Sequence, residues 1–165
     1  MPRQILALCH GNVCRSPYLA AVLQRDLAHS SAAPVILSAG FVGPGRAVPS
    51  HAALIGARHG VDLSGHRSTL VTPALMARSD LVLVMDAVQA DKARRLCAAT
   101  PPRIIVLGDL DPEWPNARTV RDPWNGDESA FEESYTRIDR CVRVLVSAMR
   151  GISVSENPPS TMRAR

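Results

Sequence analysis

The chain has 165 residues, 46% of them hydrophobic, which fits one domain with a substantial core. Its net charge is +4, but the basic residues are scattered and lack the interleaved aromatics of a nucleic-acid-binding stripe, so no nucleic-acid partner is expected. No apolar run approaches the ~20 residues of a membrane span, and the first apolar run begins too close to Met1 to leave room for a signal peptide. Four cysteines in such a chain predict reduced thiols and a cytoplasmic location.

Apolar runs alternate with helical patterns along the chain. Short apolar runs predict buried strands at residues 4–8, 35–37, 81–85 and 104–107. Apolar spacings of three and four predict helices at residues 17–28, 49–59, 72–77, 87–97 and 129–149. This alternation predicts an α/β fold with one open parallel sheet of about four strands and helices on both faces, a flavodoxin-like three-layer architecture. We expect one domain over residues 1–150 and a disordered tail over residues 151–165.

The segment between the first strand and the first helix carries the strongest chemical signal. It reads Cys9-His10-Gly11-Asn12-Val13-Cys14-Arg15-Ser16-Pro17. Backbone N–H groups of a tight loop and the N-terminus of a helix together attract anions, and the planar fork of Arg15 matches phosphate oxygens. A thiol in such surroundings favours its thiolate form, so Cys9 is predicted to be a nucleophile beneath a bound phosphate.

Other residues of this loop have more than one possible role. Ser16 could cap the helix, with Pro17 at the first helical position, or donate a hydrogen bond to Cys9. Gly11 and Asn12 both tolerate positive φ, which would turn N–H groups inward. Cys14 could form a disulfide with oxidised Cys9, or it could be a small side chain packed beneath the loop.

The carboxyl ends of parallel strands meet at one edge of the sheet, where ligands bind. The segment 9–17, the Gly- and Pro-rich loop 40–49 and the irregular stretch 108–127 should therefore converge there. The leaving oxygen of a phosphate ester needs a proton donor, and the stretch 108–127 offers two Asp-Pro pairs, one at Asp111 and one at Asp122. Either pair could instead be a turn former.

The segment 9–17 as a whole resembles the signature loop of the low-molecular-weight protein tyrosine phosphatases of bacterial type. Matching segments follow at 38–40, at 79–86 and at Asp122-Pro123-Trp124, so the resemblance covers residues 3 to about 150. It implies metal-independent and cofactor-free hydrolysis of phosphotyrosine in a protein partner, through a cysteinyl-phosphate. It also implies Cys9 as nucleophile, Arg15 as phosphate ligand and Asp122, rather than Asp111, as general acid.

The resemblance extends to supporting residues. It implies a phosphate-binding loop formed by His10, Gly11, Asn12, Val13, Cys14, Arg15 and Ser16. Asn12 would be held by Ser38 and His66, and the pocket would be walled by Trp124, with Phe41 in place of a tryptophan found in eukaryotic members. We expect a monomer or a weak dimer.

Other functions on the same scaffold are weighed by single positions. Bacterial protein-arginine phosphatases carry a threonine where this chain has Val13, so phosphoarginine is the second candidate. Thiol-dependent arsenate reductases need a downstream cysteine pair, whereas Cys97 stands alone in that region. A non-catalytic phosphate-binding module would be expected to lose Cys9, Arg15 or Asp122. The four cysteines lack zinc-site spacing, so no metal is expected, and packing is the simpler role for Cys97 and Cys141 on their helices.

Overall fold

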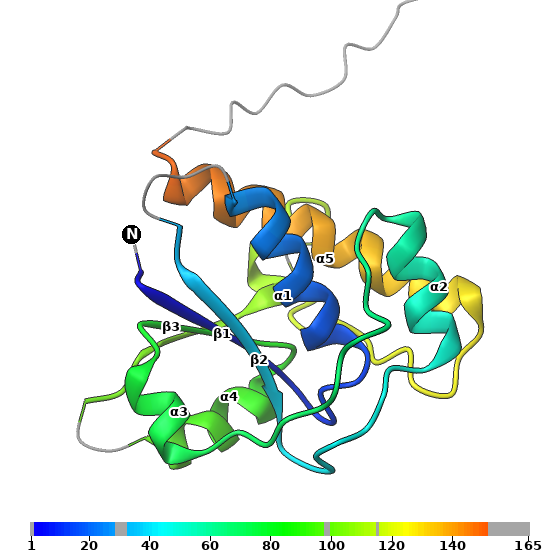
Figure 1. Ribbon diagram of the computed structural model, residues 1–165. Coiled ribbons are helices and arrows are strands. Elements are labelled where there is room, and N and C mark those ends of the chain that lie inside the picture. Colours follow the sequence, from blue (N-terminus) through cyan, green and yellow to red (C-terminus); the bar gives the residue numbers. More distant parts are fainter. Residues whose placement is uncertain (1, 29–32, 98–99, 115, 152–165) are drawn as a thin grey trace, which may run out of the picture.

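The computed structural model describes residues 2–28, 33–97, 100–114 and 116–151. Its sheet has four strands, which are β1 (Gln4–Cys9), β2 (Val35–Gly40), β3 (Leu81–Val84) and β4 (Arg103–Val106). All three pairings are parallel and the order is β2-β1-β3-β4 (Figure 1). The parallel four-stranded sheet predicted from the sequence is confirmed. The tail predicted beyond residue 151 lies outside the described residues.

Helices cover both faces of the sheet. On one face lie α1 (Arg15–Leu27), α2 (Ser50–Arg58) and the long α5 (Glu128–Met149), and on the other lie α3 (Pro73–Arg78) and α4 (Ala87–Arg95) (Figure 1). A short 3-10 helix, η1 (Leu107–Leu110), follows β4. No helix in the described parts of the chain has the length and apolar character needed to cross a membrane.

The central strand β1 shows why these strands read as unbroken apolar runs. Successive side chains of a strand point to opposite faces. Ile5 and Ala7 therefore pack in the cluster beneath α1 and α5, whereas Leu6 and Leu8 pack in the cluster beneath α3 and α4. A strand with helices on both faces needs apolar residues at every position.

The start of α1 differs from the prediction in a way that matters for the site. The helix begins at Arg15, its N-terminal flanking residue is Cys14, and no side chain caps it. The prediction that Ser16 is the N-cap, with Pro17 at the first helical position, is therefore wrong. The hydroxyl of Ser16 is instead bound within the loop, as described below. The prediction for Cys97 is also wrong. Helix α4 ends at Arg95, so Cys97 lies beyond that helix rather than on it.

Candidate active site

In the loop between β1 and α1, a chain of hydrogen bonds runs from Asn12 through Ser16 to Cys9. Cys9 is only 2% exposed, and the Ser16 hydroxyl donates to its Sγ at 3.0 Å. Asn12 Nδ2 donates in turn to Ser16 Oγ at 2.9 Å. Because Asn12 occupies a lone pair of Ser16, the hydroxyl proton of Ser16 is left for Cys9 or for the more distant Ala39 carbonyl at 3.4 Å. Ser16 thus lies where it stabilises a thiolate on Cys9.

Asn12 fixes the shape of the loop. It is fully buried and has a left-handed φ of 52°, which asparagine tolerates better than most residues. Its Nδ2 also donates to Ser38 Oγ at 2.9 Å, its Oδ1 accepts from Thr69 N at 2.8 Å, and its carbonyl lies 2.8 Å from His66 Nε2. The structure therefore brings Ser38 and His66 to the asparagine that the resemblance assigned to them.

Two glycines allow close backbone approaches around the same loop. Gly11 does not adopt the positive φ predicted for it, but a Cβ there would lie 2.6 Å from Arg46 Nη2. A Cβ on Gly40 would lie 2.7 Å from the backbone nitrogen of Asn12, well inside contact distance. Glycine is therefore favoured at positions 11 and 40 because a side chain would collide with its neighbours, not because the backbone needs a positive φ.

Sequence reasoning missed Arg46, in the loop after β2. Its Nη2 donates to the Gly11 carbonyl at 2.9 Å and to the Val42 carbonyl at 3.2 Å, and its Nε donates to the Gly43 carbonyl at 2.9 Å. This side chain fastens the loop 40–49 onto the phosphate-binding loop. A single arginine in a glycine-rich loop has no local pattern that could have identified it.

Arg15 carries a buried positive charge to the base of the loop. It is 3% exposed at the first residue of α1, the end of a helix where a cation is electrostatically unfavourable. Its Nη1 donates to the Val120 carbonyl at 2.8 Å, and its Nη2 pairs with the Asp122 carboxylate. Its buried Nε has no hydrogen-bond partner among the described residues. A buried donor without a partner is costly, so this atom points to an anionic ligand.

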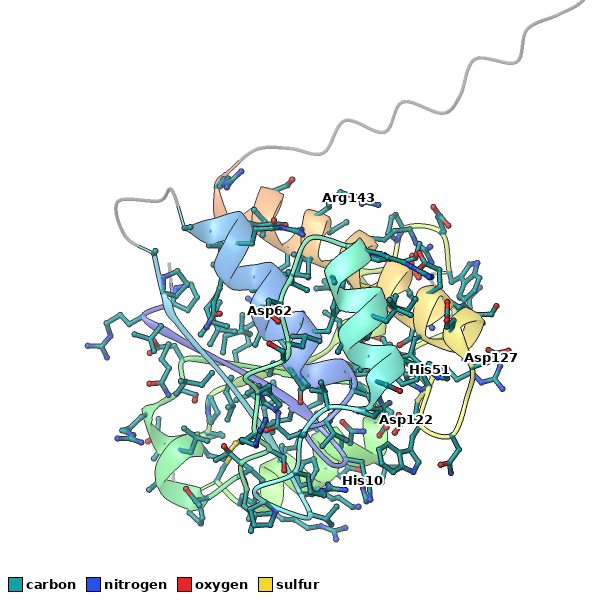
Figure 2. The ribbon with its side chains drawn as sticks, turned by 45° about the vertical axis from the view of Figure 1, so that its right-hand side comes forward. His10, His51, Asp62, Asp122, Asp127 and Arg143 are labelled. Carbon is teal, nitrogen blue, oxygen red and sulfur yellow. The ribbon has the colours of Figure 1, made fainter. Side chains whose placement is uncertain are left out.

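Asp122 meets Arg15 from the stretch that follows β4. Its side chain is 39% exposed, and its second oxygen accepts from the backbone nitrogen of Trp124 at 3.2 Å. The turn behind it is closed by the Gly126 nitrogen on the Pro123 carbonyl at 2.8 Å. Figure 2 shows Asp122 and His10 at the same end of the molecule, with Arg143 at the opposite end. A carboxyl that pairs with the buried Arg15 guanidinium and also reaches solvent can exchange a proton with a molecule bound beside it.

Asp111 has opposite surroundings. Its side chain is fully buried and accepts from Arg137 Nε at 2.8 Å and from Arg140 at 2.9 and 3.0 Å. Burial raises the pKa of this carboxyl, but the hydrogen bonds from Arg140, the Glu113 backbone nitrogen and Arg137, together with the charge of Arg140, outweigh burial and hold the pKa below its usual value. Trp114 covers the same two arginines, with their guanidinium carbons 5.2 and 5.3 Å from its ring centre. Asp111 and Trp114 therefore belong to a structural ion cluster.

The predicted pocket walls differ in exposure. Trp124 is 50% exposed beside Asp122, so it does not pack the loop onto the core. His10 is exposed, and its carbonyl accepts from Phe41 N at 2.8 Å. Phe41 is half-buried with Lys92 Nζ 5.7 Å from its ring centre, and Val13 is only 4% exposed within the core.

The four cysteines are all free thiols. Cys14 is 2% exposed, and burial, followed by the negative charges of Asp122 and Cys9, raises the pKa of its thiol to about 12. Burial and then the charge of Asp111 raise the pKa of Cys141 to about 12. Cys97 is half-buried, and burial raises its thiol pKa as well. In the parts of the chain that the structure describes, no three His, Cys, Asp or Glu side chains are grouped to hold a metal ion.

Comparison with known proteins agrees with this geometry. A family model described as "Low molecular weight phosphotyrosine protein phosphatase" matches residues 4–154. The probable low molecular weight protein-tyrosine-phosphatase EpsP of Ralstonia nicotianae is 33% identical, over 92% of this chain and 99% of that protein. Wzb of Salmonella typhi, also named a low molecular weight protein-tyrosine-phosphatase, is 31% identical, over 90% of this chain and 95% of that one.

Solved structures show the same fold. The tyrosine phosphatase amsI of Erwinia amylovora aligns with a TM-score of 0.79 at 29% identity, covering 90% of this chain and 93% of that one. Wzb from Escherichia coli K30 in complex with sulphate also gives 0.79, at 27% identity, covering 90% and 99%. Wzb of Vibrio vulnificus in complex with benzylphosphonate gives 0.77 at 25% identity, covering 88% and 97%. The chain belongs to the low molecular weight phosphotyrosine protein phosphatase family.

Proposed function

We propose that this chain hydrolyses phosphotyrosine in protein substrates through a cysteinyl-phosphate on Cys9, without a metal ion. One observation carries the proposal: the buried Arg15 guanidinium joins the Cys9 loop to Asp122 and keeps an unpartnered Nε. A tetrahedral phosphate accepts hydrogen bonds from such a fork, and its charge compensates that of the guanidinium. The sulphate and benzylphosphonate complexes of the Wzb relatives support an oxyanion ligand of this kind.

In the first half of the reaction the phosphate binds the loop and Arg15, above the sulfur of Cys9. The Cys9 thiolate attacks phosphorus, the bond from phosphorus to the tyrosine oxygen breaks, and Asp122 protonates the departing oxygen. Arg15 stabilises the charge that develops on the phosphoryl oxygens, which supplies the electrostatic role that a metal ion has in other phosphatases. The phosphate also takes over part of the Arg15 guanidinium from Asp122, which leaves that carboxyl free to face the leaving group.

In the second half water attacks the cysteinyl-phosphate. Asp122, now ionised, accepts the proton of the attacking water, and the bond between sulfur and phosphorus breaks. Cys9 leaves as a thiolate that the Ser16 hydroxyl, 3.0 Å away, stabilises. Inorganic phosphate then dissociates and the site returns to its starting state.

The exposed side of the candidate site supports an aryl ester as substrate. Trp124 is half exposed next to Asp122, where its ring can stack on the ring of phosphotyrosine. Phosphoarginine remains the competing substrate to be tested, and a phosphotyrosine-containing protein is the partner that we propose.

The test is phosphate release from three peptides of one sequence that carry phosphotyrosine, phosphoserine or phosphoarginine, with a metal chelator present. We expect the highest kcat/KM for phosphotyrosine, with no loss on chelation. Faster turnover of phosphoarginine would replace the substrate assignment, and loss of activity with the chelator would contradict the metal-free mechanism. Trapping a phosphoryl group on Cys9 by acid quench, followed by peptide mapping, tests the intermediate.

A further inference from the structure

The segment that leads to Asp122 is held by side chains. Of its backbone groups, the Val120 nitrogen donates to the Met85 carbonyl at 2.9 Å and the Ala117 nitrogen donates to the Trp114 carbonyl at 3.1 Å. Its carbonyls, by contrast, accept from side chains of two helices: those of Ala117 and Thr119 from Arg137, that of Val120 from Arg15 and that of Arg121 from Ser134. The segment is therefore held by these donors, together with the ion pair of Arg118 with Asp109 in η1.

Arg137 makes most of these contacts. Its Nη1 donates to the Thr119 carbonyl at 2.6 Å, its Nη2 donates to the Ala117 carbonyl, and its Nε donates to Asp111 at 2.8 Å. The side chain is 6% exposed, and it stacks on Trp114. A planar fork with all three nitrogens engaged on fixed acceptors has little freedom to move.

Ser134 adds a contact on the same helix face, one turn before Arg137 in α5. Its hydroxyl donates to the Arg121 carbonyl at 3.3 Å, next to the acid itself. The segment also packs closely against η1, because a Cβ on Gly108 would lie 2.1 Å from the Arg118 carbonyl oxygen. The segment 117–121 thus lies against η1 and α5, with Val120 buried and its other four residues exposed.

We infer that Arg137 is a positioning residue for Asp122: by holding the carbonyls of Ala117 and Thr119 it sets the distance from the acid to the leaving oxygen, with Ser134 assisting at Arg121. The inference rests on the proposed function, because it assumes that Asp122 is the acid. A misplaced acid impairs protonation in proportion to the basicity of the leaving group. Phenyl phosphate should therefore suffer more than p-nitrophenyl phosphate, whose leaving group needs little protonation.

Arg140 provides a matched control. It lies one turn after Arg137 in the same helix, binds the same Asp111 carboxylate and stacks on the same Trp114 ring. Its remaining contact is with Glu113 at 3.3 Å, and among the described residues none of its bonds reaches the segment 117–121. Substitution of either arginine by lysine weakens the buried ion cluster, but only Arg137→Lys releases the carbonyls that precede the acid.

The experiment measures kcat/KM for both esters, together with Tm, in wild type, Arg137→Lys, Arg140→Lys, Ser134→Ala and Asp122→Asn. For Arg137→Lys we expect a loss of about 10- to 100-fold on phenyl phosphate, the scale of a displacement near 1 Å, and a distinctly smaller loss on p-nitrophenyl phosphate. Arg140→Lys should lower Tm comparably but keep the wild-type ratio of the two esters. Ser134→Ala should change the ratio in the same direction by less, and it gives a result even where Arg137→Lys does not fold.

Each outcome decides between these roles. Unchanged ratios in Arg137→Lys and Ser134→Ala would overturn the inference and leave these residues as purely structural. Equal changes in Arg137→Lys and Arg140→Lys would also overturn it, because the effect would then come from the ion cluster as a whole. If Asp122→Asn itself keeps the wild-type ratio, the acid assignment fails and the inference falls with it, which separates the two failures.

Discussion

The chain contains the same short motif twice, Asp-Pro with a tryptophan close behind, and the fold gives the two copies opposite surroundings. Asp111 has a fully buried side chain between two arginines, with Trp114 covering them. Asp122 is 39% exposed, forms its ion pair among the described residues with Arg15 and has Trp124 half exposed at its side. Burial and the number of donors, and not the motif, separate a structural carboxylate from one that can transfer protons.

The hydrogen bonds of each carboxylate explain the difference. Asp111 accepts three bonds from arginines and a fourth from the Glu113 backbone nitrogen at 3.1 Å, so both of its oxygens are occupied and its lowered pKa keeps it ionised. Asp122 accepts one bond from Arg15 and one from the Trp124 nitrogen. Asp122 therefore depends on one arginine donor, whereas Asp111 is held by two arginines that make three bonds.

The largest expected effect lies on the Asp122 side of this comparison, at Cys9, the proposed nucleophile. Cys9→Ser should reduce kcat by roughly 10⁵- to 10⁶-fold, as loss of a covalent nucleophile does elsewhere, with little change in Tm. Vanadate should still bind, because Arg15 and the loop remain. Steady-state kinetics and vanadate titration provide the measurement, and activity within about tenfold of wild type, a barrier change of only ~1.4 kcal/mol, would exclude Cys9 as nucleophile.

For the buried pair, Asp111→Ala should lower the free energy of unfolding. Its loss leaves Arg137 and Arg140 buried without their shared carboxylate, which typically costs about 3–5 kcal/mol. This loss in the free energy of unfolding is larger than the loss expected if Asp111 only formed a turn. Urea unfolding measures the free energy of unfolding of this variant beside Asp122→Ala, for which we expect a smaller change because only one arginine loses its partner and solvent reaches the 39% exposed Asp122 side chain. Equal destabilisation of both variants would refute the contrast.

A separate, partly exposed ion cluster around His59 makes a pH-dependent contribution to stability. His59 lies 2.8 Å from Asp139 and 2.7 Å from Glu132; burial opposes its protonation, but the two carboxylates outweigh burial and raise its pKa. A raised folded-state pKa stabilises the fold fully below the unfolded value of about 6.5, and this contribution is lost as pH rises through the folded-state pKa. The difference in unfolding free energy between wild type and His59→Gln should therefore be larger near pH ~6 than near pH ~9, and a difference independent of pH would contradict it.

The smallest expected effect concerns Cys14. Attack of Cys14 on peroxide-oxidised Cys9 would form the disulfide and release water, but it requires the Cys14 thiolate, and a pKa of about 12 makes that species scarce at neutral pH. Because the charge of Asp122 is, after burial, the next cause of that raised pKa, Asp122→Asn should form the disulfide faster, whereas Asp111→Asn should not. Peptide mapping after mild oxidation measures the rate.

Two outcomes, one from peptide mapping and one from an activity assay after reduction, would count against the redox role. Absence of any Cys9–Cys14 linkage in wild type would exclude the pairing itself. Equal recovery of activity by wild type and Cys14→Ser after reduction would show that Cys14 gives no protection, since we expect the variant to recover less.

Local patterns predicted most of the fold, because strands buried on both faces and amphipathic helices leave clear periodicities. The site was predictable where its residues are contiguous, as at Cys9 and Arg15, or where the family resemblance supplied partners, as at Ser38 and His66. Arg46 and Arg137 were not, since each acts on backbone carbonyls far away in sequence, with which a lone arginine shares no pattern. The start of α1 was misplaced because Ser16 binds Cys9 instead of capping the helix.

The central claim, that Asp122 and not Asp111 transfers the proton, is tested most directly by the dependence of kcat/KM on the leaving group. Asp122→Ala should lose about 10²- to 10⁴-fold on phenyl phosphate, the usual contribution of a positioned general acid, and much less on p-nitrophenyl phosphate. Asp111→Asn, assayed below its Tm, should follow the wild-type dependence on both esters. If Asp111→Asn shows the steeper dependence and Asp122→Ala does not, the roles assigned to the two Asp-Pro pairs are reversed and the account is wrong.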